Sequence, residues 1–546
     1  MTQHQIVLFV VLPMAAGIVT TFLHRYRQAQ RWVGAGFLIA NMVFAFKALA
    51  TVAPTGAVLV SQMGNWLAPF GITIAVDTLS ALMLTMASIV CFCVFLYCAF
   101  QFDRDQQGGF FHPMFHLLIM GVQWSFITGD FFNLFVAFEI MLMASYAIFC
   151  VGTSKKQMKQ AYKYVLLNLL GSTMFVTCLG LIYGQLGTLN MADITRLAMD
   201  DKLPTSSLPV IAMMLLVFGG KTAIFPLWYW LPDTYHTLPS AIGGLFAGLL
   251  TKVGAYVMIR VFVMMFGTST QVTDIIAPIL LLTAGITMFL GVLGAVSMHT
   301  VRRILSIHII SQVGYMLMGM GLAIASGVAP DIKEMAVAGA IFFIMHNMVV
   351  KCCLFLCGGL MVEHAGDDDL EKIGGLLKRA PWLATLFMIA ALSLAGLPPL
   401  SGFFGKWVLL SAGFQSEHYV VVFFAVLTSL FTLLSMLKIW SYGFWSPAQG
   451  KHVDQPKKRP MTIGGMWGIA LLVIVALSMG LGAQKYYSMC AMAAKSLIDP
   501  TNYVKAVLGE QNTPEYKVVI NEPTSQAQPM HHESHEPAAN HDSHGH

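Results

Sequence analysis

Long apolar stretches alternate with short polar connections over most of the chain. A helix that crosses the hydrocarbon core of a bilayer needs about 20 apolar residues, and stretches of this kind recur about fourteen times. They lie near 5–23, 32–52, 75–100, 112–128, 131–151, 164–186, 208–231, 240–265, 273–297, 304–325, 335–360, 381–410, 418–440 and 463–484. The pattern predicts an all-α polytopic membrane protein with about fourteen transmembrane helices. The count depends most on dividing 112–151 at Gly129-Asp130.

Composition agrees with lipid as the main solvent. Hydrophobic residues make up 57% of the 546 residues and charged residues only 10%, whereas soluble domains carry about 25% charged residues. Lys and Arg form no basic stripe, which argues against nucleic acid as a partner. The cysteines lie almost entirely within apolar runs and suggest neither a disulfide framework nor a metal site.

Lys and Arg are divided unevenly between alternate loops. One set of loops is basic, around Arg25, Lys155, Arg302, Lys378 and Lys457, whereas the opposite short loops hold Arg196, Lys202 and Lys333. Because cytoplasmic loops are enriched in Lys and Arg, we expect both termini on the non-cytoplasmic side of a bacterial plasma (inner) membrane.

Two of the predicted helices are interrupted by glycine and proline. The seventh reads FGGKTAIFPLWYW around Lys221, and the twelfth reads AGLPPLSGFFGKW around Lys406. Helices five apart run in opposite directions, which suggests two inverted five-helix repeats, helices 4–8 and 9–13. The expected regions are 1–110 (helices 1–3), 111–265 and 266–440 (the two repeats), 441–486 (a cytoplasmic loop and helix 14) and 487–546 (a polar, His-rich, non-cytoplasmic tail).

Ionisable residues within the predicted spans are candidates for ion translocation. Each costs about 2.5–3.5 kcal/mol at mid-membrane, so such groups are seldom kept without a use or a partner. Glu139, Lys221, Lys252 and Lys406 lie deep in their helices. Low dielectric disfavours the charged form of both acid and lysine, so together they could form a proton relay; the alternative is a structural Glu–Lys pair between helices. Arg260, Lys438 and Lys47 are expected to extend toward the interface instead.

The histidines are more ambiguous than the lysines. His346 and Lys351 share one predicted helix but point about 140° apart, so both could border a wet channel without touching. His308 suits either a relay or a structural hydrogen bond. His236, in the loop PDTYHTLPS, either admits protons from the cytoplasm or is a satisfied loop residue. The tail histidines could bind a divalent metal loosely, or simply belong to a solvated segment.

The chain shows no nucleotide-binding loop, dinucleotide fingerprint, haem motif or iron–sulfur motif. We therefore expect no cofactor and neither a redox centre nor an ATPase in this chain. The energy for transport would then come from an ion gradient or from a partner subunit.

Several motifs together resemble a known family. They are VDTLS from Asp77, FVAFEIMLMASY with Glu139, GGKTAIFPLWYWLPDTYHTLPS with Lys221 and His236, LLTKVGAY with Lys252, SIHIISQVGYM with His308 and GLPPLSGFFGKW with Lys406. Across roughly 70–440 the chain resembles the proton-pumping antiporter family shared by respiratory complex I and the multisubunit Mrp-type cation/proton antiporters, and within it the D-type Mrp subunits.

The resemblance implies a function, a site and partners. The site would be a conducting axis of Glu139, Lys221, Lys252 and Lys406. The function would be that of a secondary transporter subunit exchanging Na⁺ or K⁺ for protons, assembled with other Mrp subunits. An alternative is a proton-pumping membrane-arm subunit of a complex I-like or hydrogenase-like oxidoreductase. A non-conducting scaffold and a unit of an inorganic-carbon uptake system are further alternatives.

Overall fold

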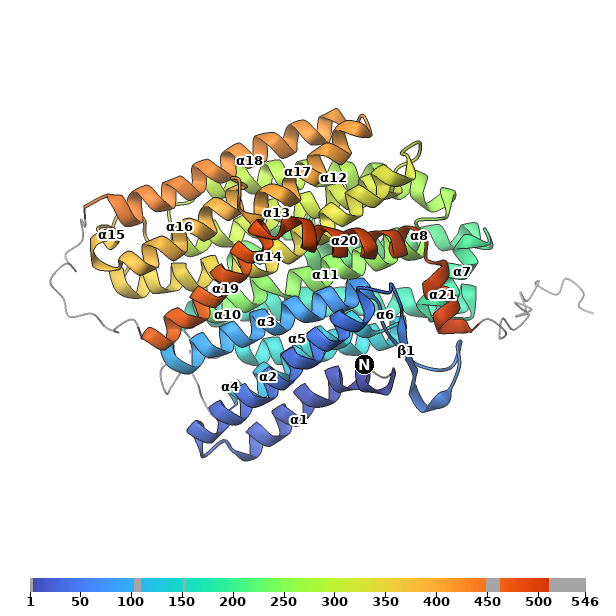
Figure 1. Cartoon of the computed structure of the whole chain (residues 1–546), viewed down its shortest axis with the longest axis horizontal. Coiled ribbons are helices and arrows are strands. Elements are labelled where there is room, and N and C mark those ends of the chain that lie inside the picture. The colour runs from blue at the N-terminus through green and yellow to red at the C-terminus, as the bar shows by residue number, and fades with distance from the viewer. Residues whose placement is uncertain (1–2, 103–109, 151–153, 448–461, 510–546) are drawn as a thin grey trace, which may run out of the picture. The chain divides into compact units, whose positions relative to one another are not determined.

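The computed structural model describes residues 3–102, 110–150, 154–447 and 462–509 (Figure 1). These residues are almost entirely helical. The described strands are β1 (Leu59–Gln62) and β2 (Thr73–Val76), which pair antiparallel with Leu59 opposite Val76. The hairpin lies in the connection between α2 (Arg27–Val52) and α3 (Thr78–Gln101).

Twelve helical segments among the described residues are long and apolar enough to cross a membrane, so the expected helical polytopic architecture is confirmed. They contain α1 (Leu8–Phe22), α2 (Arg27–Val52), α3 (Thr78–Gln101), α5 (Phe131–Phe149), α6 (Lys155–Leu186), α8 and α9 (Leu208–Thr222, Trp230–Tyr235), α10 and α11 (Ser240–Gly248, Leu250–Met258), α12 (Thr270–Ser297), α13 (Val301–Ile324), α14 (Pro330–Ala365), α18 (Tyr419–Trp440) and α19 (Ile463–Leu481).

The other two predicted spans also form helices, but shorter ones. α4 covers Phe111–Ile127, and the stretch 381–410 is divided into α16 (Pro381–Ala395) and α17 (Ser401–Gln415). Because α4 ends before Gly129 and α5 begins after Asp130, the predicted division between these helices is confirmed. The connecting elements α7 (Met191–Met199) and α15 (Leu376–Arg379) are short.

Polar N-caps fix where several helices begin. The side chains of Asp77, Asp130, Ser154 and Asn190 accept hydrogen bonds from backbone N–H groups in the first turns of α3, α5, α6 and α7. A helix leaves its first N–H groups without intrahelical partners, and a short polar side chain satisfies one of them. These caps set the register of the helices that follow.

In the described part of the chain three of the predicted spans are broken helices, although glycine and proline in the sequence indicated only two. α8 ends at Thr222, with Ala223 in the left-handed region, and α16 ends at Ala395, with Gly396 at φ +91°. The third break lies at Leu249, between α10 and α11, where φ is −116°. No proline marks this break. α11 then continues into the π-helical turn η5 (Ile259–Met265).

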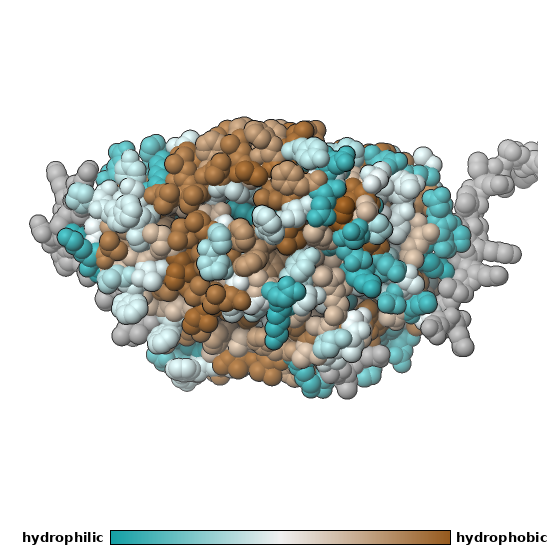
Figure 2. All heavy atoms as spheres, turned by 45° about the horizontal axis from the view of Figure 1, so that its top comes forward, coloured by the Kyte–Doolittle hydropathy of each residue, from teal (hydrophilic) through white to brown (hydrophobic). Residues whose placement is uncertain are grey.

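Burial separates a central group of helices from a peripheral one. The most apolar windows of α10–η5, α13 and α14 are entirely enclosed by protein, whereas those of α1, α2 and α6 are about one-third buried. Figure 2 shows one face, with hydrophobic residues over its middle and hydrophilic ones toward both ends. The peripheral helices present apolar side chains outward, as contact with lipid requires.

The expected boundary of the polar tail at residue 487 is wrong. α19 is followed at once by α20 (Ala483–Ile498) and then α21 (Thr501–Leu508), drawn in deep red in Figure 1. α20 packs along α14. Its residues Cys490, Ala493, Ala494 and Leu497 recur at helical spacing and are fully buried. An average over a long window hides such an amphipathic stripe. The histidines of the tail lie outside the described residues.

Candidate functional site

Glu139 and Lys221 interact electrostatically. They are not among the direct ion pairs that the described residues form. The Lys221 ammonium lies 5.0 Å from the centre of the Phe138 ring. Its Nζ and the Oε1 of Glu139 are shielded from solvent but have no hydrogen-bond partner in the described protein. Lys221 borders a cavity of about 20 Å³ that Tyr164, Asn168 and Trp230 also line. That volume suits a single water molecule.

The end of α8 packs tightly against the helix that carries Lys252. A Cβ on Gly254 would lie 2.5 Å from Oγ1 of Thr222, so only glycine allows this approach. Lys221 directly precedes Thr222, and Gly254 lies two residues after Lys252. The contact therefore brings Lys221 close to the backbone of the helix that carries Lys252.

Lys252 is fully buried beside the break between α10 and α11. Its Nζ donates to the backbone oxygen of Ala247 at 2.8 Å and to Oγ1 of Thr251 at 3.1 Å. A helix ends with carbonyl groups that lack intrahelical partners and carry a partial negative charge. The break at Leu249 therefore supplies the acceptor that holds the ammonium inside the protein.

Lys406 repeats this arrangement at the end of α16. Its Nζ donates to the backbone oxygens of Leu394 at 3.1 Å and Ala395 at 2.9 Å, and it lies 5.1 Å from the centre of the Tyr315 ring. A Cβ on Gly396 would come within 3.0 Å of Cδ of Lys406. Glycine is thus needed both for the backbone turn and for the lysine to pass. Two broken helices solvate two buried lysines in the same way.

α14 carries Lys351 and His346 between these lysines. Lys351 is fully buried and interacts electrostatically with Lys252 and Lys406, but its Nζ has no hydrogen-bond partner in the described protein. Nδ1 of His346 lies 2.9 Å from Oγ of Ser401, at the start of α17. The expectation that His346 and Lys351 do not touch but share a surrounding is consistent with these contacts.

His308, on α13, extends the same group of residues. Its Nε2 is hydrogen-bonded to Ser435 on α18, and its Nδ1 lies 3.3 Å from Oγ of Ser311. It interacts electrostatically with Lys351 and Lys406. His308 therefore has hydrogen-bond partners and still belongs to the charged group, so neither of its two interpretations is excluded.

His236 has different neighbours. Its Nδ1 lies 2.7 Å from the backbone oxygen of Pro232, and the charged groups near it are Lys156, Arg303 and Asp233. Burial lowers the pKa of the imidazole below its ordinary value, and the two cations act in the same direction. Asp233 itself pairs with Lys163 at 2.8 Å. His236 thus lies in a surface ion-pair network, not among the buried lysines.

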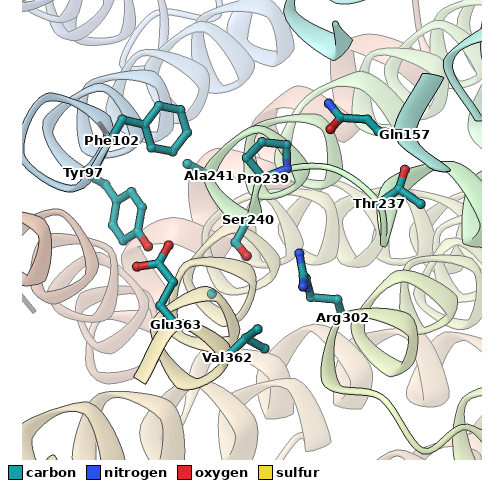
Figure 3. A pocket seen from close by; sticks show the side chains of 11 residues that line it. Tyr97, Phe102, Gln157, Thr237, Pro239, Ser240, Ala241, Arg302, Val362 and Glu363 are labelled. Atoms are coloured by element: carbon teal, nitrogen blue, oxygen red, sulfur yellow. The ribbon is translucent and has the colours of Figure 1, made fainter. Parts of the chain in front are cut away.

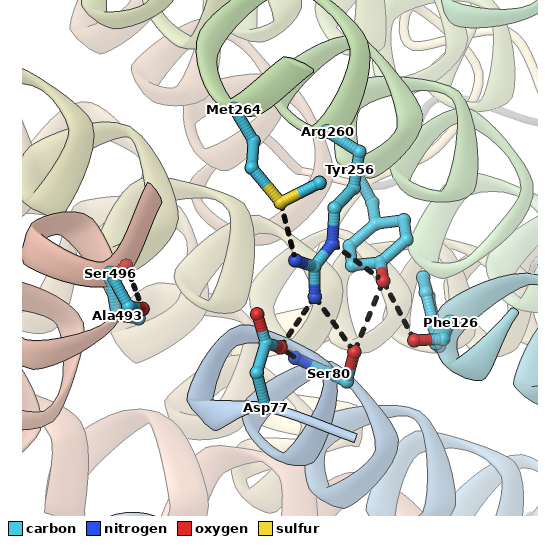
Figure 4. Close-up of polar contacts among 8 residues, drawn as sticks. All are labelled: Asp77, Ser80, Phe126, Tyr256, Arg260, Met264, Ala493 and Ser496. Carbon is cyan, nitrogen blue, oxygen red and sulfur yellow. Dashed lines mark hydrogen bonds and ion pairs between the residues drawn. The ribbon is translucent and has the colours of Figure 1, made fainter. Parts of the chain in front are cut away.

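The interpretation of Arg260 as a side chain that reaches the interface is wrong. Arg260 is enclosed by protein and forms an ion pair with Asp77, the N-cap of α3 (Figure 4). It also donates to Oγ of Ser80 at 2.9 Å and to the hydroxyl of Tyr256 at 3.0 Å. The helical spacing of Lys252, Tyr256 and Arg260, together with the acid of the VDTLS motif, was the signal that could have indicated this network.

Among the described residues, no group of three or more His, Cys, Asp or Glu side chains is arranged to hold a metal ion. The buried groups are instead lysines and histidines linked by electrostatic interactions, interspersed with hydroxyl side chains. Such an arrangement can store and pass protons, because each protonation changes the charge that its neighbours experience.

Comparison with known proteins identifies the family. The family described as NADH:quinone oxidoreductase/Mrp antiporter, transmembrane, matches residues 128–432. The D-type subunit of the Na(+)/H(+) antiporter of Alkalihalophilus pseudofirmus is 40% identical over 508 residues, covering 92% of this chain and 99% of the relative. The chain belongs to the NADH:quinone oxidoreductase/Mrp antiporter family. The match includes Glu139, Lys221, Lys252 and Lys406 within one continuous segment.

Solved structures of relatives share the fold. A chain of the Mrp complex from a Dietzia species superposes with a TM-score of 0.83 at 29% identity, covering 93% of this chain and 99% of that one. A chain of an archaeal membrane-bound sulfane sulfur reductase gives the same TM-score at 23% identity, covering 93% and 100%. The second likeness shows the fold alone. The same membrane architecture therefore occurs in an Mrp complex and in a respiratory complex.

Proposed function

We propose that the chain is a D-type component of a multisubunit antiporter that exchanges Na⁺ or K⁺ for protons across the plasma membrane. The observation that carries the proposal is the buried row of lysines, in which Lys252 and Lys406 are each solvated by the carbonyl end of a broken helix. The near full-length relationship to the D-type component of a Na(+)/H(+) antiporter supports the same assignment. Its partners would be the other subunits of such a complex.

In this proposal protons move along the axis by charge alternation. The relay comprises Glu139, Lys221, Lys252, Lys351, His346, Lys406 and His308. Lys351 interacts electrostatically with both Lys252 and Lys406. Like charges repel strongly in a medium of low dielectric constant. A proton that binds one lysine therefore favours release from the next. His236 would act outside this row, at the surface where protons enter.

The inverted repeat belongs to the same proposal. The fourth to eighth and the ninth to thirteenth predicted spans would form the two units, so that α5 corresponds to α13 and the broken helix α8–α9 to the broken helix α16–α17. Glu139 on α5 interacts with Lys221 on α8, and His308 on α13 interacts with Lys406 on α17. These matching pairs support the repeat. Fourteen spans with both termini on the non-cytoplasmic side would complete the topology, with the regions 1–110, 111–265, 266–440 and 441–486 as its parts.

Cation-dependent pH change in inverted vesicles tests the proposal. The vesicles come from antiporter-deficient cells that express the complete set of subunits, with wild type compared with Lys221→Ala and Glu139→Gln. We expect exchange in the wild type and its loss in both variants, although the complexes assemble. Lys47→Ala is the matched control, because Lys47 is exposed on the peripheral helix α2. Full exchange by an assembled Lys221→Ala complex would contradict the role of the axis.

A second candidate function is a proton-pumping membrane arm of an energy-converting oxidoreductase. The fold shared with the sulfane sulfur reductase chain favours it as the alternative. There the same lysines would be driven by redox chemistry in partner subunits. Proton pumping by wild-type vesicles that depends on a quinone or on hydrogen, without cation exchange and with iron–sulfur subunits co-purifying, would favour this function over the antiporter.

A further inference from the structure

A cavity of about 280 Å³ lies where α3, α13 and α14 end or begin (Figure 3). Its polar wall includes Tyr97, Ser240, Arg302 and Glu363. Figure 3 shows the Glu363 carboxylate beside Tyr97, with Ser240 and Arg302 across the space. Since a water molecule occupies about 30 Å³, a cavity of this size and polarity accommodates several waters.

The cavity lies on the face of the bundle that carries Lys and Arg. Arg302 is at the start of α13, and Gln157, another lining residue, is in the first turn of α6 beside Lys155 and Lys156. The charge bias of the loops assigns this face to the cytoplasm. The cavity is therefore placed to receive protons or water from that side.

Both helical walls of the cavity carry relay lysines further along. Val362 lines the cavity, and Lys351 precedes it by eleven residues on α14. Eleven residues make three turns, so Lys351 lies on the same helix face about 16 Å further along. On the other wall, Ser240 begins α10, which leads through the break at Leu249 to Lys252.

A seam of small residues separates the cavity from those lysines. A Cβ on Gly359 would lie 2.4 Å from Cβ of Ser240, and one on Gly244 would lie 3.3 Å from the backbone oxygen of Cys352. α10 and α14 thus touch almost backbone to backbone, which leaves little room for water between them. Water could reach Lys351 from the cavity along this seam only if the two helices moved apart.

We propose that this cavity is the proton-uptake vestibule of the relay and that Glu363 is its proton acceptor. A proton from cavity water binds the Glu363 carboxylate. It then leaves through water in the opened seam for the neutral amine of Lys351, which restores the carboxylate and forms an ammonium. Gln101 donates to Oε2 of Glu363 at 2.8 Å and holds the side chain in place. The inference rests on the proposed function.

Few charged or titratable side chains line the described wall of the cavity together with Glu363. Among the described residues that line the cavity, the titratable or charged side chains other than Glu363 are Tyr97 from α3 and Arg302 from α13. Arg302 also pairs with Asp368 at 3.4 Å. α10 and α6 contribute the neutral Ser240 and Gln157.

Glu363→Gln tests the acceptor, because the amide keeps the shape and can still accept from Gln101. In inverted vesicles at saturating cation, we expect the exchange rate to fall at least about tenfold at alkaline pH on the cytoplasmic face. The loss should shrink as that pH falls and protons become abundant, and Glu363→Asp should restore part of the rate. Glu334→Gln, near the opposite end of α14, is the matched control. A rate equal to wild type at every pH overturns the role of Glu363.

A second measurement holds even if Glu363→Gln fails to assemble. Thr237→Cys places a thiol in the cavity wall, and Thr177→Cys on the outward face of α6 is the control. Labelling of the wild-type protein is measured in parallel and subtracted. Above that level, we expect a charged methanethiosulfonate reagent to modify Thr237→Cys in inverted vesicles but not in right-side-out vesicles. Modification from the opposite side, or from neither side, overturns the vestibule. Absence of exchange in the wild type would instead contradict the antiporter function.

Discussion

Asp77 and Arg260, 183 residues apart in the sequence, form an ion pair that is enclosed by protein. Asp77 caps the first turn of α3, and Arg260 lies in the π-helical turn that continues α11. The aromatic ring of Tyr503, on α21, packs beside this pair: Cζ of Arg260 lies 5.5 Å from the ring centre. The pair therefore ties the helix that carries Lys252 to α3 and to the end of the described chain.

Breaking this pair should destabilise the protein strongly. Asp77→Asn keeps an N-cap but leaves the Arg260 charge without its counterion, which typically costs about 3–5 kcal/mol for a buried pair. Asp200→Asn removes the carboxylate of the exposed Lys202–Asp200 pair and should cost at most about 1 kcal/mol. Thermal unfolding of the purified complexes measures both. Equal midpoints for the two variants would contradict this account of Arg260.

Gly396→Ala should impair transport more than assembly. The new Cβ would lie 3.0 Å from Cδ of Lys406, at a backbone position with φ +91° that side chains rarely adopt. Displacing the ammonium by about 1 Å can cost about a hundredfold in rate. Gly171→Ala, where a Cβ meets nothing within 4 Å, should leave exchange unchanged. Exchange rates in vesicles, normalised to assembled complex, decide between these outcomes.

The stability of the wild-type protein should fall as the pH rises, because of Asp130. It lies just before α5, outside the spanning segments, and burial raises the pKa of its carboxyl from 3.8 to about 6. The folded protein holds this proton more tightly than the unfolded chain, so the stabilising contribution is complete below pH 3.8 and is lost as the pH rises through 6. Above pH 6 the loss amounts to about 3 kcal/mol.

Asp130→Asn retains the cap and removes this titration. The variant should therefore gain stability over wild type as the pH rises from about 4 to about 6, with a constant difference above that range. Thermal unfolding of both complexes across this pH range measures the effect. A difference that does not change with pH would show that the carboxyl does not titrate in this window.

Truncation separates the packed C-terminal helices from the polar tail. A stop after Gly482 removes α20 and α21, exposes the face of α14 on which α20 packs, and should abolish assembly. A stop after Asn512 removes the segment that carries the tail histidines and should leave exchange intact. Co-purification of partner subunits and vesicle exchange measure both variants. Assembly that survives the first truncation would contradict a structural role for α20.

Much of the architecture could be predicted because lipid imposes a simple rule on the sequence. Every spanning segment must be apolar and must satisfy its own backbone, so the helices, the division at Gly129-Asp130 and the breaks near Pro226 and Pro399 are visible as local patterns. The third break, at Leu249, could not be predicted in this way. It carries no proline, and the carbonyl that it leaves at Ala247 accepts from Lys252, a contact made only in the folded protein.

The sequence by itself determined the membrane class, the apolar segments and the identity of the buried acids and bases, because each depends on residue type and local spacing. Only the tertiary structure decided which groups meet: that Lys252 and Lys406 rest on the ends of broken helices, that Glu139 and Lys221 stay apart, and that Arg260 pairs with Asp77. It also decided that α20 packs on α14. The physical reason is that contacts between helices depend on how their faces fit together, which no local pattern encodes.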